Sequence, residues 1–322
     1  MTIATAAPGG VAPRDPAVLL GLAILALFAV SPFLLDALGA GHLQSLVMRA
    51  MLLAIAAVSL DLLIGRGGMV SFGHAAFVGL GAYAAGIGLT EGIQSGVLLL
   101  LLAVAVSAAF AAVTGAISLR TKGVGFIMIT LAFGQMVFFT LQSLAPYGGD
   151  DGLTLWSTAE LLGTDLLTNG GGLHFVVLAA LAGIWWLVAR ISASRFGRVL
   201  RAAKENPVRV ETMGFSVLRY RLTAYVVAGA LAGVAGFLSA CHYEFVSPAA
   251  AAWQRSGELI AVVVLGGTGT RNGALLGAVF FVAMEEVLSH FVADWRLVFG
   301  PLLVLVVLFA RGGLAGLIGR AG

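Results

Sequence analysis

The chain has 322 residues, of which 60% are hydrophobic and only 10% are charged, and its formal net charge is +3. A soluble domain carries about 25% charged residues, so this composition excludes an ordinary soluble protein and indicates an integral membrane protein. The single cysteine, Cys241, excludes an internal disulfide. Lysine and arginine do not alternate with aromatic residues in any basic run, so the expected partner is the lipid bilayer and not nucleic acid.

The N-terminal 16 residues precede the first apolar run and are expected to form a disordered cytoplasmic tail. The apolar run 17–35 is longer than the ~7–15 residues of a signal-peptide core, so we expect a retained first helix. The remainder, 17–322, is expected to form a single transmembrane domain. It contains a basic cytoplasmic loop at 191–221 and an outer loop at 145–173.

Ten apolar runs are candidate membrane spans, each judged against the ~20 residues that a helix needs to cross a bilayer. They are 17–35, 44–64, 71–89, 97–119, 125–144, 174–190, 222–241, 257–268, 274–291 and 297–311. Cytoplasmic loops carry an excess of lysine and arginine. With the N-terminus inside, all 18 Lys and Arg except Arg49, Arg255 and Arg296 fall on the cytoplasmic side. The sequence therefore predicts an all-α integral membrane protein of about ten transmembrane helices, with both termini in the cytoplasm.

Two segments are poorly suited to ordinary membrane helices. The segment 65–88 is rich in glycine, and the run 257–268 spans only ~18 Å as a helix against a hydrocarbon core of ~30 Å. Glycines at 266, 267 and 269 follow, so we expect a short broken helix near 257–270. Broken backbone at membrane depth is tolerated only where protein or a water-filled cavity covers it. Both segments indicate either a solute path or tight helix packing, and the residues leave both open.

The loop 191–221, with Arg190 at its start, holds eight of the 18 Lys and Arg. Within it, Asn206-Pro207 followed by Gly214 predicts a two-turn helix, because asparagine caps a helix, proline suits its first position and glycine ends it. Val210 and Met213 are three residues apart and are expected on one exposed face. This helix is either a docking site for a cytoplasmic partner or part of a charged loop that only fixes orientation.

No enzymatic constellation is visible in the sequence. It contains no GxxxxGK[ST] phosphate-binding loop and no GxSxG, HExxH or CxxC motif. Its histidines are scattered with no second ligand at i+3 or i+4, so no metal site is expected. Ionisable residues within spans are functional candidates, and here they are Asp61, Glu285 and Glu286. Asp61 is either a functional group or an interface residue near Arg66, and the glutamates either pair with Arg296 or form a proton relay.

Five ordered segments resemble the LivM-type permeases, the inner-membrane subunits of ABC importers for branched-chain amino acids. The segments, which fall within roughly 45–310, are 60–83 (LDLLIG, GMVSFGHAAF and GLGAY), 125–134, 148–154, 197–236 and 265–277. Two departures stand out. Asp61 replaces the asparagine usual in the family, and 208–211 replaces a segment that is alanine-rich in many members.

The resemblance implies a multi-pass permease of the bacterial inner membrane that passes branched-chain or other small amino acids, or related amides or urea, to the cytoplasm. It implies three kinds of partner subunit: a second, LivH-type permease, two cytoplasmic ABC ATPase subunits that bind ATP and Mg, and a periplasmic solute-binding protein. No cofactor and no catalytic residue are expected on this chain. The alternative is a stand-alone proton- or sodium-coupled secondary transporter, in which Asp61, Glu285 or Glu286 would be essential.

The resemblance also assigns candidate site residues. In the family, the loop that matches 198–214 contacts the ATPase. The candidate ATPase-coupling residues are therefore Arg198, Arg201, Glu205, Pro207, Val210, Met213 and Gly214. The candidate residues of the translocation path are Ser71, Gly73, His74, Phe77, Gly79, Tyr83, Thr130, Gly134, Gly266, Gly267 and Gly269.

Overall fold

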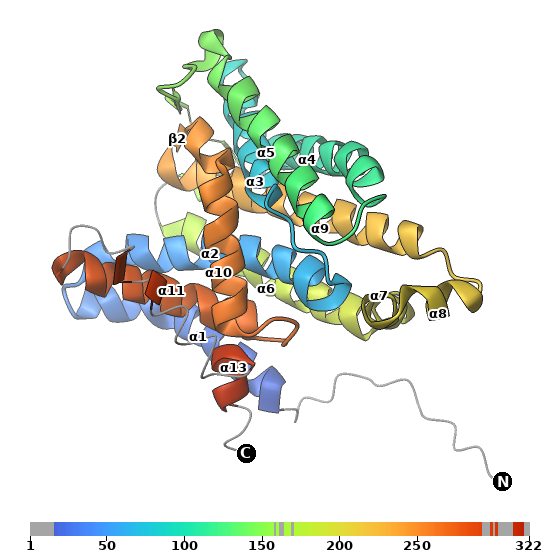
Figure 1. The fold of residues 1–322 in the computed structure, drawn as a ribbon. Helices are drawn as coiled ribbons and strands as arrows, with labels where there is room; N and C mark the ends of the chain where they lie inside the picture. The colour runs from blue at the N-terminus through green and yellow to red at the C-terminus, as the bar shows by residue number, and fades with distance from the viewer. Residues whose placement is uncertain are drawn as a thin grey trace.

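The structure is a computed structural model that describes residues 16–157, 159–160, 164–168, 171–291, 297–298, 300–301 and 312–318. Seven helical segments in these residues are long and apolar enough to cross a membrane (Figure 1). They contain α1 (Pro16–Ala37), α2 (Gln44–Asp61), α4 (Gly96–Ser118), α5 (Val124–Gln142), α6 (Gly171–Ala193), α9 (Val217–Tyr243) and α11 (Gly273–Phe291). The predicted all-α membrane class is confirmed.

Two shorter helices complete the described membrane bundle. They are α3 (His74–Thr90) and α10 (Trp253–Gly266). Each of the first nine predicted spans thus corresponds to a helix, and the short helix expected near 257–270 is α10. The predicted tenth span, 297–311, and the tail 1–16 lie almost wholly outside the described residues, so the count of ten stays a prediction.

The centre of the bundle is α3, which packs against both α4 and α9. Small residues allow this close approach. A Cβ atom added to Gly81 would lie 2.4 Å from the carbonyl oxygen of Gly233, and one added to Gly236 would lie 2.1 Å from that of Val78. α2 is buried along most of its length and packs against α6, α9, α10 and α11. The glycines of 65–88 therefore place α3 against its neighbours.

The chain leaves helical geometry between α2 and α3. After Asp61 the helix widens into a π-helical turn, η2 (Leu62–Arg66), and an irregular stretch runs from there to the start of α3. Gly68 has φ +66°, a conformation that glycine adopts without steric cost. The span expected at 71–89 accordingly begins three residues later, at His74. A second break follows α10, where Gly267 has φ +109° and Gly269 has φ +73°.

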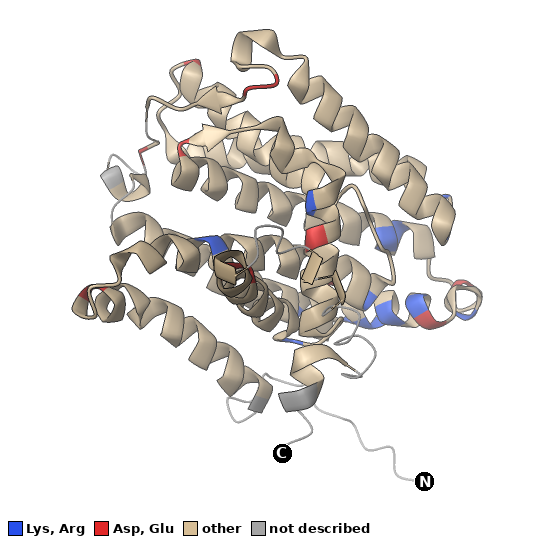
Figure 2. Cartoon of the chain, turned by 60° about the vertical axis from the view of Figure 1, so that its left-hand side comes forward, with Lys and Arg blue, Asp and Glu red and all other residues tan. Residues whose placement is uncertain are grey.

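Short elements connect the spans at both ends. They are η1 (Gly41–Leu43), η3 (Ala145–Tyr147), β1 (Leu153–Thr154), η4 (Asp165–Leu167), α7 (Arg195–Glu205), α8 (Pro207–Thr212), β2 (Phe245–Val246), η5 (Pro248–Ala251) and α13 (Gly313–Ile318). Figure 2 shows Lys and Arg gathered around α7 and α8, together with Glu205 and Glu211, whereas the outer loop 145–173 at the other end carries Asp and Glu but no Lys or Arg. This separation of charge is the pattern expected when the α7–α8 end faces the cytoplasm.

Candidate functional site

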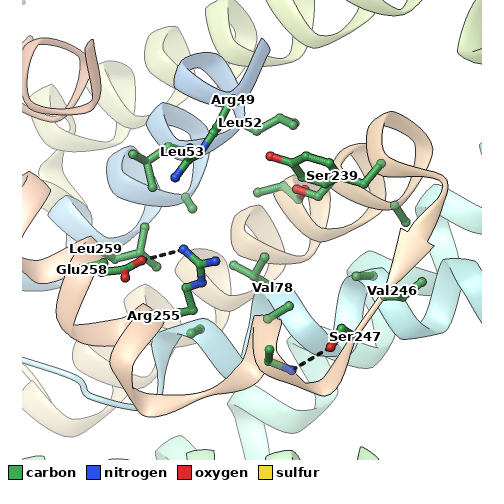
Figure 3. A pocket seen from close by; sticks show the side chains of 18 of the residues that line it. Arg49, Leu52, Leu53, Val78, Ser239, Val246, Ser247, Arg255, Glu258 and Leu259 are labelled. Atoms are coloured by element: carbon green, nitrogen blue, oxygen red, sulfur yellow. Dashed lines mark hydrogen bonds and ion pairs between the residues drawn. The ribbon is translucent and has the colours of Figure 1, made fainter. Parts of the chain in front are cut away.

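A cavity of about 670 Å³ lies among α2, α3, α9, α10 and α11 (Figure 3). Its position, where α9 ends and α10 begins, is at the end opposite α7 and α8, which the charge pattern assigns to the outer side. Aliphatic and aromatic side chains form much of its wall, among them Leu52, Leu53, Val78, Leu259 and Phe281. The volume falls within the ~300–1,000 Å³ typical of small-molecule sites.

Two ion pairs border this cavity. Arg49 of α2 donates through Nη2 to Oε2 of Glu285 on α11 at 2.5 Å. Arg255 donates through Nη1 to Oε2 of Glu258, one turn further along α10, at 2.7 Å. Glu285 therefore has a partner on another helix, and the expected pairing with Arg296 stays a prediction, because Arg296 lies outside the described residues. Spacing along the chain could not reveal a pair separated by 236 residues.

The mouth of the cavity is built where α9 gives way to extended chain. Glu244 caps α9 with φ +50°, and it is the one non-glycine residue with positive φ in the described chain. β2 follows and pairs antiparallel with β1 of the outer loop, with Leu153 opposite Val246. The N–H of Leu155 donates to the carbonyl of Glu244 at 2.8 Å. Because Val246 lines the cavity, the outer loop is part of its rim.

The outer loop is also tied to the loop between α3 and α4. The hydroxyl of Tyr147 donates to Oε1 of Glu91 at 2.9 Å. This hydrogen bond raises the pKa of the Tyr147 hydroxyl, since it favours the protonated phenol. The carboxylates Asp150 and Asp151 lie in the same loop. The outer end therefore carries negative charge around a tethered loop.

The coupling loop, residues 191–221, contains the helix that the sequence predicts. The Asn206 side chain accepts from the N–H of Arg209 at 3.0 Å, Pro207 occupies the first helical position and Gly214 has φ +87°. The expectation that Val210 is exposed is wrong, because Val210 is 4% exposed and packs with Ala203 and Val217. 

Two other apolar residues form the exposed surface of this helix. Val208 is 66% exposed and Met213 is 67% exposed. Met213 lies beyond the last helical residue, at the C-cap, so the helical spacing from Val210 does not place the two on one face. The exposed apolar pair in this part of the loop is thus Val208 of α8 and Met213 at its C-cap.

Basic residues fasten α7 to the bundle. Arg198 donates to the carbonyl of Ala193 and Arg201 to that of Ser192, both at 3.1 Å, and these carbonyls end α6. Lys204 donates through Nζ to the carbonyl of Gly65 in the π-helical turn at 3.0 Å. The Glu205 side chain is exposed. α7 therefore contacts both α6 and the break after α2.

Asp61 is buried at this break, with 5% of its surface exposed. Its Oδ1 accepts from the N–H of Gly269 at 2.7 Å. Gly65 also approaches this backbone closely, since a Cβ added there would lie 2.4 Å from the nitrogen of Gly269. Both interpretations of Asp61, a functional group or an interface residue near Arg66, stay predictions, and the side chain bonds to a loop 208 residues away. It fixes the loop between α10 and α11 against the end of α2.

Residues 43–308 match the family described as "Branched-chain amino acid transport system / permease component". The chain belongs to this permease family. The match spans most of the described helices, from α2 onward. The permease is a multi-pass protein of the bacterial inner membrane and a transport component of an ABC import system, as its relatives are.

Three relatives show the range of this similarity. The high-affinity branched-chain amino acid transport system permease protein LivM of Salmonella typhimurium is 28% identical, over 91% of this chain and 73% of its own length. BraD of Pseudomonas aeruginosa, described in the same terms, is 27% identical over 82% and 91%. The autoinducer 2 import system permease protein LsrC of Enterobacter sp. is 31% identical over 91% and 85%. No solved structure matches the permease.

The candidate path residues lie on α3 and the stretch before it, on α5, and at the end of α10 and just after it, and none of them lines the cavity formed by the described residues. Ten of the eleven are buried, and Gly269 is partly buried. A Cβ added to Gly73 would lie 2.3 Å from the carbonyl oxygen of Thr130, and one added to Gly266 would lie 1.8 Å from that of Gly273. In this conformation they act in tight helix packing, and a role in the path stays a prediction.

His74 belongs to the same packed region. Its Nε2 lies 2.8 Å from Oγ of Ser59, and its ring makes an edge contact with Phe77. The side chain is fully buried. His74 is thus hydrogen-bonded within the bundle, and its role in the solute path stays a prediction.

Proposed function

We propose that the permease is a translocating subunit that passes branched-chain or other small amino acids, or related amides, from a periplasmic binding protein to the cytoplasm. Its proposed partners are a second permease and two ATPase subunits that bind ATP and Mg. The names of LivM and BraD support the amino acid, whereas LsrC shows that the family also serves autoinducer 2. The solute would enter the cavity among α2, α3, α9, α10 and α11.

The observation that carries this proposal is the coupling loop. It presents exposed apolar residues, Val208, Met213, Phe215 and Leu218, within the most basic part of the chain. A short helix with such a surface suits a groove on a partner protein. The chain has no phosphate-binding loop, so the energy of ATP must come from another subunit. Docking at this loop would move α6 and α9, which flank it.

The transition between outward- and inward-facing states then depends on the partners. A partner shifts the balance between two conformations only by its difference in affinity for them. An ATPase bound at the coupling loop supplies that difference when it binds and hydrolyses ATP. The packed glycine contacts of α3 and of the α10–α11 loop are where the two conformations would differ, and there the candidate path residues would become accessible.

The test is affinity purification of the tagged permease from its native membrane, beside the double variant Val208→Asp, Met213→Asp. We expect an ATPase and a second permease with the native chain, and loss of the ATPase and of uptake with the variant. Val124→Asp is the matched control, because Val124, the first residue of α5 at the same end, is similarly exposed, and this variant should retain both.

Two outcomes would contradict the proposal. Full transport by the double variant would mean that the coupling loop is not the ATPase contact. If no ATPase accompanies the native chain and uptake follows the ion gradient, the permease works as an ion-coupled carrier, and Asp61 with Glu285 and Glu286 becomes the site to examine.

A further inference from the structure

The two ion pairs at the cavity are held differently. Arg49 and Glu285 join α2 to α11, and their side chains are 36% and 16% exposed. Arg255 and Glu258 lie on a single turn of α10, and the Arg255 side chain is 51% exposed. Separating the first pair would disconnect two helices, whereas the second pair joins two side chains of the same helix. The Glu258 side chain is 19% exposed, so Arg255 is the more exposed partner, and its guanidinium can turn toward a ligand at small cost to the fold.

The α10 pair offers complementary groups to one solute. A guanidinium carries five N–H donors in a planar fork that matches a carboxylate, and a carboxylate accepts several hydrogen bonds from an ammonium group. Arg255 uses Nη1 for its bond to Glu258. Figure 3 shows both side chains on the α10 wall, with Leu52 and Leu53 on the α2 wall. An apolar side chain could therefore lie against α2 while the charged end contacts α10.

The charge balance selects among solutes. The guanidinium groups of Arg49 and Arg255 are matched by the carboxylates of Glu258 and Glu285. A solute of a single charge sign would meet groups of its own sign close by, and such juxtaposition is unfavourable. A molecule that carries both signs on neighbouring atoms meets a partner for each.

We propose that Arg255 and Glu258 form a recognition pair in the permease itself, in which Arg255 binds the carboxylate and Glu258 the ammonium group of a zwitterionic α-amino acid. The inference rests on the proposed function for the direction and energy of transport. It adds that selection of the solute is not left to the binding protein alone. Arg49 and Glu285 keep their own ion pair, which joins α2 to α11 at the same cavity.

The test measures binding of radiolabelled L-leucine to the full chain, purified in nanodiscs with the subunits that remain attached and without ATP. Two competitors separate the charges, since 4-methylpentanoate lacks the ammonium group and 3-methylbutylamine lacks the carboxylate. We expect unlabelled leucine to displace the label and each analogue to compete about 10-fold less well or worse, since each loses a hydrogen bond to a charged group.

Variants assign the residues. Arg255→Ala and Glu258→Gln are each expected to weaken leucine binding about 10-fold or more, and Arg255→Lys to weaken it less, because lysine keeps the charge without the fork. Arg120→Ala, at an exposed arginine of the α4–α5 loop, is the matched control and should bind as the native chain does. An unchanged elution volume in gel filtration distinguishes loss of the site from loss of the fold.

Equal competition by either analogue, unchanged binding by Arg255→Ala, or no saturable binding at millimolar leucine would each overturn the recognition pair. None of these outcomes bears on co-purification of an ATPase through the coupling loop, so failure of this inference and failure of the proposed function are distinguishable.

Discussion

At the scale of single residues, Asp61 shows how a polar side chain can organise two separate breaks in the membrane bundle. Its carboxylate accepts the N–H of Gly269 in a loop that glycine makes irregular. A buried N–H group without a partner is costly, so the acceptor matters for the fold whether or not it carries charge. Lys204 reaches the same region from the coupling loop through the carbonyl of Gly65.

Asp61→Ala removes the acceptor and leaves the Gly269 N–H without it, which is expected to lower the free energy of unfolding by about 1–3 kcal/mol. Asp61→Asn keeps an oxygen acceptor and should stay close to the native chain in both stability and uptake. Thermal unfolding of the detergent-purified variants, with exposed Asp36→Ala as control, measures the first effect. If Asp61→Asn folds normally but no longer transports, the charge itself has a function.

At the scale of elements, α10 is short because its own sequence ends it and because α11 crosses it closely. Gly266 is the last residue of α10, and a Cβ there would lie 1.8 Å from the carbonyl oxygen of Gly273 at the start of α11. Backbone contact of this kind requires glycine. The two helices are thereby held in one arrangement around the loop that Asp61 binds.

Gly266→Ala is accordingly expected to destabilise the permease by about 1–3 kcal/mol, as overpacking does, and to reduce uptake. Gly183→Ala on α6 is the matched control, because a Cβ at Gly183 would meet no atom within 4 Å. That substitution should be neutral or stabilising by up to ~1 kcal/mol, since alanine favours helix. Equal melting temperatures for the two variants would show that the α10–α11 contact is not close in the native membrane.

How much of these elements could be predicted from sequence depended on the range of the interactions involved. The ends of α8 follow from Asn206, Pro207 and Gly214, which act on their own neighbours, and both breaks were marked by glycine. Periodicity along the chain carries no information on contacts such as Asp61 with Gly269 or Arg49 with Glu285, which join distant segments. The glycine segment 65–88 does line the cavity, through Ala75, Val78 and Ala82, but none of the individual candidate path residues does.

At the scale of the whole molecule, the cytoplasmic and outer ends are connected through α10. Lys204 of α7 binds the π-helical turn, this turn packs against the loop after α10, and the first turns of α10 carry the charged pair of the cavity. Displacement of α7 by an ATPase would therefore reach the cavity through a single rigid helix. This route is established only if breaking one of its contacts changes the coupling between ATP hydrolysis and solute uptake.

Lys204→Ala tests this route. The variant keeps Val208 and Met213, so the ATPase should still co-purify, but uptake per ATP hydrolysed is expected to fall several-fold because α7 has lost its bond to Gly65. Proteoliposomes of the full importer report both rates together. Lys122→Ala, in the α4–α5 loop, is the control with unchanged coupling, and an unchanged ratio for Lys204→Ala would remove this contact from the route.

The strand pair at the cavity mouth has a mechanical consequence. Glu244 stands in the left-handed region, which costs a non-glycine residue about 1–2 kcal/mol, and the adjoining strands contribute only two residues each. A few hydrogen bonds at the mouth of the cavity thus hold a turn that would relax if they parted. We expect a small push on the outer loop, such as the landing of a loaded binding protein, to open the mouth without dismantling the bundle behind it.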